Sequence, residues 1–60
     1  MREFVMYALD ESGAVKSTDY FIGMTEAAVR SFATKQLKKS ACVEVWEGKV
    51  CILRRKRSRQ

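Results

Sequence analysis

The chain has 60 residues, a net charge of +5, no histidine and no proline. A chain of this length forms one small domain, which leaves little room for a catalytic core, a cofactor pocket and a substrate cleft together. A hydrophobic fraction of 47% argues against an intrinsically disordered chain. The longest apolar run, Phe4 to Leu9, is too short for a membrane span or a signal peptide. We therefore expect a folded, cytoplasmic protein with no membrane span.

The positive charge is concentrated in the last residues of the sequence. Residues 1–53 contain seven basic and seven acidic residues and carry no net charge. The segment 54–60, RRKRSRQ, contains five basic residues and no acidic one. We therefore expect one folded domain over 1–53 and a disordered basic tail over 54–60, with Arg54 still completing the last strand.

The first half of the chain predicts two strands joined by a tight turn. Residues 2–9 are rich in aromatic and branched side chains and are apolar on both faces, as in a central strand. Residues 10–13, DESG, form a polar turn with glycine in the last position. Residues 14–22 begin polar and become apolar at Tyr20, which predicts a second strand whose first half is an exposed edge.

A helix is predicted to follow, beginning at Thr25 and ending at about Lys39. Thr25 is a good N-cap, and Glu26 places a negative charge in the first turn. Apolar residues then recur at helical spacing, at Val29, Phe32, Ala33 and Leu37. The lysines near the end of this segment complement the helix dipole.

The last predicted element is a β-hairpin, with strands over 42–46 and 49–53 and a turn at Glu47-Gly48. This register pairs Val45 with Val50 and Val43 with Ile52, so these four side chains face the helix. The opposite face of the hairpin carries Cys42, Glu44, Trp46, Lys49, Cys51 and Leu53. The element order is therefore β-β-α-β-β, an α+β fold in which one helix packs on a four-stranded, mostly antiparallel sheet. The sequence does not say what covers the second face of the sheet.

The sequence contains no recognisable catalytic or metal-binding pattern. It lacks a histidine general base, a glycine-rich phosphate loop and a nucleophile motif, and Asp10-Glu11 is typical of a solvated turn. Cys42 and Cys51 have too few partner ligands for a zinc site and lie diagonally in the predicted hairpin, where a disulfide would require a different turn. We expect two reduced thiols, no metal, no cofactor, no small-molecule substrate and no enzymatic activity.

The leading functional prediction is nonspecific binding of nucleic acid through the basic tail. A cluster of this kind binds phosphate backbones, and five neutralised phosphates would give a salt slope of about −4.5. The alternative role for the tail is to keep a small apolar domain soluble. The residues expected to contact phosphates are Arg54, Arg55, Lys56, Arg57 and Arg59 of the tail and Arg30, Lys35, Lys38 and Lys39 of the helix.

The rival prediction is a homodimer or a protein-binding module. One helix of about 14 residues cannot cover all the apolar side chains of such a sheet, so either the hairpin curls over them or they form an interface. A second copy is the simplest occupant of that interface. The residues expected there are Trp46, Leu53, Cys42 and Cys51.

Two short segments resemble those of small β-β-α-β-β proteins of unknown function from bacterial and phage genomes. The helix start Thr25-Glu26-Ala27-Ala28 and the hairpin segment 43–48, VEVWEG, carry this resemblance. It implies the same fold and assigns no functional residue.

Overall fold

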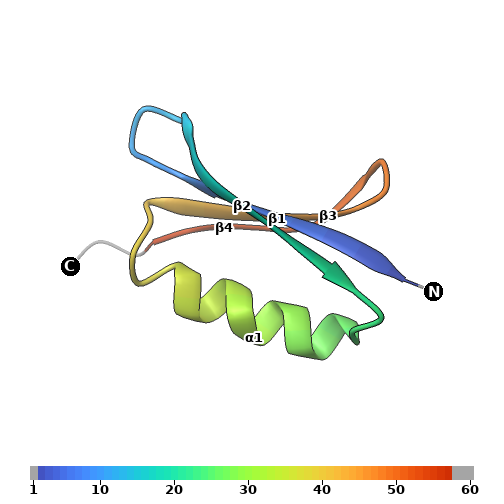
Figure 1. Cartoon of the computed structure of the whole chain (residues 1–60). Coiled ribbons are helices and arrows are strands. Elements are labelled where there is room, and N and C mark those ends of the chain that lie inside the picture. Colours follow the sequence, from blue (N-terminus) through green and yellow to red (C-terminus); the bar gives the residue numbers. More distant parts are fainter. Residues whose placement is uncertain (1, 58–60) are drawn as a thin grey trace.

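A computed structural model describes residues 2–57 of the chain and confirms the predicted β-β-α-β-β order (Figure 1). The elements are β1 (Glu3–Leu9), β2 (Val15–Ile22), α1 (Glu26–Gln36), β3 (Cys42–Glu47) and β4 (Val50–Lys56). Within the described residues, no helix is long and apolar enough to cross a membrane.

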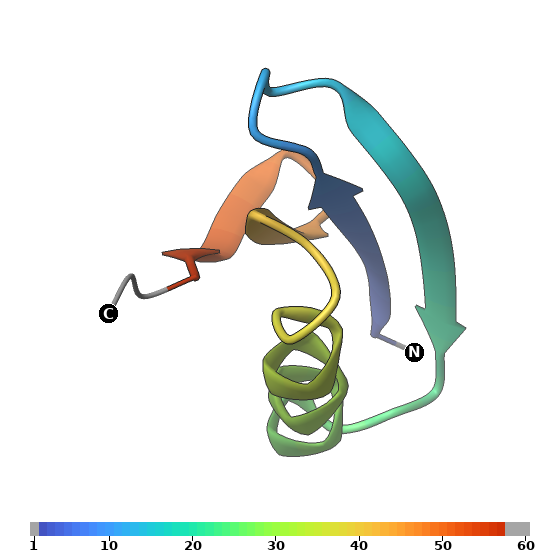
Figure 2. The same ribbon diagram turned by 90° about the vertical axis from the view of Figure 1, so that its left-hand side faces the viewer.

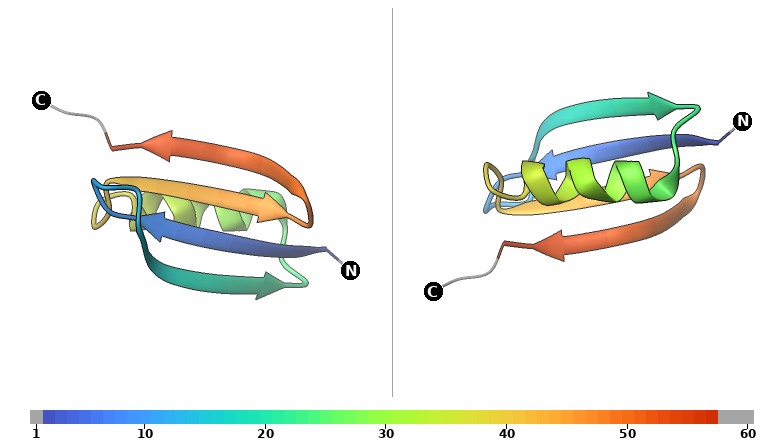
Figure 3. Two further views of the ribbon diagram at one scale, coloured as in Figure 1. Left: turned by 90° about the horizontal axis from the view of Figure 1, so that it is seen from above. Right: turned by 90° about the horizontal axis from the view of Figure 1, so that it is seen from below.

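The four strands form one antiparallel sheet in the order β2-β1-β3-β4. The two hairpins therefore lie side by side, with β1 and β3 in the centre and β2 and β4 at the edges (Figure 3). The helix α1 covers one face of this sheet, and both hairpin turns rise away from it (Figure 1). The opposite face, which we call the outer face, is not covered by any described segment (Figure 2).

The turn between β1 and β2 forms as its residue types predict. The amide of Gly13 donates to the carbonyl of Asp10 at 3.0 Å, and one Asp10 carboxylate oxygen accepts from the amides of Ser12 and Ala14. Gly13 adopts a φ of 90°, which a residue with a side chain rarely does. A polar side chain and a glycine thus fix the first hairpin.

The helix begins at the predicted residue and ends earlier than predicted. The hydroxyl of Thr25 accepts from the amide of Ala28 at 3.2 Å, so Thr25 is the N-cap. The helix ends at Gln36, and Leu37 forms the C-cap. Lys38 and Lys39 therefore lie in the turn that leads to β3. The spacing of apolar residues stops at Leu37, so the basic residues beyond it add nothing to the buried face of the helix.

The hydrophobic core lies between α1 and the inner face of the sheet. Alternate residues of the two central strands point toward the helix, since side chains alternate along a strand. The ring of Phe21 on β2 stacks on Phe32 of α1, with centroids 5.4 Å apart, which closes this side of the core. The buried apolar residues are Phe4, Met6, Ala8, Val29, Ala33, Val43 and Val45.

The predicted register of the second hairpin is wrong. The strands are joined by Gly48 and Lys49, not by Glu47-Gly48, and Glu47 pairs with Val50. Gly48 has a φ of 61°, whereas Lys49 has a negative φ, which is the pattern of a type II′ turn. The register then shifts at Trp46, so Trp46 pairs with Cys51 but Val45 pairs with Leu53.

This bulge moves Leu53 to the other face. Leu53 and Ile52 both pack against the core, whereas Val50, which was expected under the helix, is 62% exposed. The strand β4 also continues through Lys56, two residues beyond Arg54, which was expected to complete it. Lys56 pairs with Cys42 at the start of β3, so pairing with β3 rather than hydrophobicity decides where this strand ends.

Candidate functional site

The charges at the N-terminal end of α1 pair with one another. The guanidinium of Arg2 bonds to the carboxylate of Glu47 at 2.8 Å and lies 3.2 Å from Glu26. Arg30 lies 2.8 Å from the same Glu26, four residues earlier in the helix. Two arginines and two glutamates, from α1, from β3 and from the residue that precedes β1, are thus brought together, which leaves little net charge in this cluster.

The pKa values of these groups reflect the pairing. Hydrogen bonds from Arg30 and then Arg2 lower the pKa of Glu26, and a hydrogen bond from Arg2 lowers the pKa of Glu47. The same bonds, to Glu47 first, raise the pKa of Arg2. All three side chains stay ionised at neutral pH, so this cluster joins the helix to the sheet rather than offering charge to a partner.

The opposite end of the molecule is basic. Here the turn after α1 lies beside the end of β4, since the amide of Arg57 donates to the carbonyl of Ala41 at 2.8 Å. In the part of the chain that the structure describes, none of the cations there forms an ion pair with a carboxylate. We call this region the basic end, and it comprises Lys38, Lys39, Arg55, Lys56 and Arg57.

Lys16 adds a further cation to this region from β2. Its ammonium group donates to the carbonyl of Lys39 at 2.9 Å, which fixes the turn after α1 and partly neutralises the C-terminal end of the helix. Cations from β2, from the turn after α1 and from β4 therefore meet at one end, although they are far apart in the sequence.

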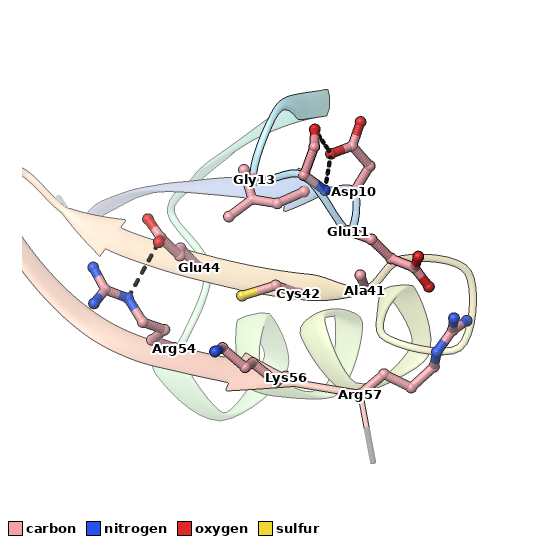
Figure 4. A pocket seen from close by; sticks show the side chains of 11 residues that line it. Asp10, Glu11, Gly13, Ala41, Cys42, Glu44, Arg54, Lys56 and Arg57 are labelled. Atoms are coloured by element: carbon pink, nitrogen blue, oxygen red, sulfur yellow. Dashed lines mark hydrogen bonds and ion pairs between the residues drawn. The ribbon is translucent and has the colours of Figure 1, made fainter. Parts of the chain in front are cut away.

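A groove on the outer face borders the basic end (Figure 4). One wall is β4, with Arg54, Lys56 and Arg57, and the other is the turn over residues 10–13. Its floor comes from Leu9 and Cys42. The walls differ in charge, because the turn carries Asp10, whose pKa is lowered by hydrogen bonds from Ser12 and from the Ala14 amide.

The structure separates the predicted phosphate-binding residues into two groups. Arg30 pairs with Glu26, and Arg54 pairs with Glu44 at 3.1 Å, so both are already engaged. The other group is exposed and consists of Lys35, Lys38, Lys39, Arg55, Lys56 and Arg57. Arg59 lies outside the described residues.

Three of the four predicted interface residues lie together on the outer face. Trp46 and Cys51 are directly paired, and Cys42 lies at the start of β3, whereas Leu53 points toward the helix. The two thiols are free: Cys51 pairs with Trp46, whereas Cys42 lies four residues before Trp46 on β3 and pairs with Lys56. In residues 2–57, no cluster of three or more cysteine, aspartate and glutamate side chains is arranged to hold a metal.

Sequence analysis expected part of the Phe4–Leu9 run on the uncovered face but did not place it beside Trp46. Val5, Tyr7 and Leu9 of β1 point outward between the two hairpins, and Tyr20 of β2 lies opposite Val5. The alternation within β1 was visible, but the strand order that places Tyr7 and Tyr20 near Trp46 was not. Local sequence patterns contain no information on which strands are neighbours.

Comparison with known proteins finds no matching family model, no matching curated protein and no matching solved structure.

Proposed function

We propose that this protein binds nucleic acid through its phosphate backbone, without regard to sequence, at the basic end. The observation that supports this proposal is that cations from three separate segments meet at one end. At the other end, Arg2 and Arg30 are paired with Glu26 and Glu47. Lysine and arginine side chains that lack intramolecular partners gain the most from phosphate contacts, because no existing ion pair has to be broken.

The expected energetics are those of counterion release. If five cations contact phosphates, the slope of log affinity against log salt is about −4.5, which is roughly a 500-fold loss between 50 and 200 mM salt. Such contacts position a protein on nucleic acid but do not read its sequence. The proposal therefore predicts strong dependence on salt and weak dependence on base composition.

A substitution tests this proposal more cleanly than truncation, because removing residues 54–60 would also remove part of β4. The double variant Lys56→Gln and Arg57→Gln should reduce the salt slope by about 1.8 in titrations of a labelled duplex. Lys49→Gln is the matched control, since Lys49 precedes β4 at the opposite end of the strand. Equal losses in both variants, or no binding by the unmodified protein, would contradict the proposal.

A homodimer is the second candidate function, and the uncovered outer face is the observation that favours it. Val5, Tyr7 and Trp46 are half-buried there and adjoin one another on β1 and β3. Sedimentation at two protein concentrations tests this candidate, which requires a mass that rises with concentration and falls in a Trp46→Glu variant.

A further inference from the structure

We propose that the outer face of the sheet binds single-stranded nucleic acid, with bases stacked on Tyr7, Tyr20 and Trp46 and phosphates directed toward Lys56 and Arg57. This inference rests on the proposed function and specifies its ligand. It combines two features of the described chain, an aromatic group in the middle of an open sheet and a row of cations along one side of it.

The three aromatic side chains surround Val5. Trp46 of β3 and Tyr20 of β2 are the direct partners of Val5 on its two sides, and Tyr7 lies two residues further along β1. Two strand spacings separate Trp46 from Tyr20, about 10 Å. Each is a diagonal neighbour of Tyr7, at about 7 to 8 Å. We call these three residues the aromatic triangle. Its spacing suits contact with more than one base.

The aromatic rings are accessible from the outer face. Tyr20 is 76% exposed, and Tyr7 and Trp46 line a shallow groove together with Val5. The indole nitrogen of Trp46 donates to the carboxylate of Glu44 at 3.0 Å, which holds the ring along β3 and satisfies its only donor. The remaining surface of the indole is apolar and suited to stacking.

Cations lie on β4 beyond the aromatic triangle, toward the basic end. Arg54 and Lys56 pair with Glu44 and Cys42, so their side chains belong to the outer face. Lys56 and Arg57 line one wall of the groove that continues from this face toward the basic end (Figure 4). A strand whose bases contact the aromatic triangle can therefore place its phosphates along β4. Proteins that bind single strands without sequence preference combine a cationic track with stacking rings in this way.

The charge of the outer face favours a polyanion over a second copy of the chain. The outward residues of β2 are Val15, Thr18, Tyr20 and Ile22, which include no carboxylate. Glu44 is already bonded to Arg54 and Trp46, and Glu3 lies at the end of β1 away from Lys56. Among the described residues of a second outer face, the carboxylates that form no ion pair near the groove are Asp10 and Glu11, confined to the turn at one end. A phosphate backbone supplies negative charge along its whole length.

The experiment is a titration of the full chain with oligothymidylate and with a duplex of equal length. Trp46 is the only tryptophan, so its fluorescence reports directly on the aromatic triangle. We expect saturable quenching by the single strand and weaker binding of the duplex, whose bases cannot reach the sheet. Tyr20→Leu and Tyr7→Leu should each weaken binding of the single strand about fivefold or more, with little change for the duplex.

Phe32→Leu is the matched control, because Phe32 is 44% exposed but lies on the helix rather than on the outer face. Tyr20 lies on an edge strand and is mostly exposed, so its variant tests the inference even if Tyr7→Leu does not fold. Equal binding of single strand and duplex, with no effect of the tyrosine variants, would overturn this inference while leaving the proposed function intact. Absence of any binding would overturn both. A dimeric mass that Tyr20→Leu abolishes would show that a second copy covers the face, and would also overturn the inference.

Discussion

The two faces of the sheet are built from the same strands and differ in what they contact. On the inner face, alternate residues of β1 and β3 are almost completely buried against α1. On the outer face, the intervening residues of the same strands are half-buried, and no described segment covers them. The difference shows that one helix buries one face of the sheet and leaves the apolar side chains of the other face partly exposed.

Truncating neighbouring residues of β1 that point to opposite faces tests the difference between the faces most directly. Met6 is 3% exposed on the inner face, and Met6→Ala should cost about 2 to 5 kcal/mol in unfolding free energy. A domain of this size has a total unfolding free energy of only about 3 to 9 kcal/mol, so this variant should lose a large fraction of its stability. Tyr7→Ala on the outer face should cost about 1 kcal/mol. Urea denaturation followed by circular dichroism measures both, and equal losses would mean that the outer face is also part of the core.

A second prediction concerns the turn that sets which residues of β4 reach each face. Gly48→Ala should cost about 1 to 2 kcal/mol, because Gly48 adopts a φ of 61° that favours glycine. The cost is conformational, since an added methyl group would meet no atom within 4 Å. Lys49→Ala, at the neighbouring position with negative φ, is the control and should leave the urea midpoint nearly unchanged. Equal effects of the two substitutions would show that turn geometry does not limit stability.

The smallest expected effect concerns the ion pairs at the edge of the inner face. Because their partners lower the pKa values of Glu26 and Glu47 in the folded state, their contribution to stability is present above the ordinary value of 4.5 and is lost as the pH falls through the lowered values. Arg2→Gln should therefore weaken the fall in stability below about pH 4.5. Asp10, whose pKa is also lowered, should retain its own contribution in this variant. Urea midpoints measured across this pH range provide the test, and identical profiles for both proteins would show that Arg2 does not act through these carboxylates.

Sequence reasoning predicted the fold where local chemistry decides it. Thr25 as a helix cap, Gly13 as a turn residue and the apolar alternation of β1 are each recognisable from a few neighbouring residues. It failed in the second hairpin, because a bulge at Trp46 depends on how two strands fit rather than on either strand alone. It also ended β4 at Arg54, because Arg55 and Lys56 resemble a soluble tail but pair with Val43 and Cys42.

The candidate site was predictable only where its residues are neighbours in the sequence. The excess of cations in residues 54–60 is plain in the sequence, and it identified Lys56 and Arg57. The meeting of these residues with Lys39, and of Tyr7 with Trp46, depends on the strand order β2-β1-β3-β4. Arg30 was expected to contact phosphates, but it is paired with Glu26 in the structure, which the sequence does not show.

Both bulges of the sheet occur in its edge strands. One lies in β2, where the register shifts between Ser17 and Val15, and the other lies in β4 between Leu53 and Cys51. Bulges and charged side chains at an edge hinder the addition of further strands from other molecules. The two edges of this sheet are therefore protected against the addition of strands from other molecules. Any lasting association of the protein should involve its outer face rather than these edges.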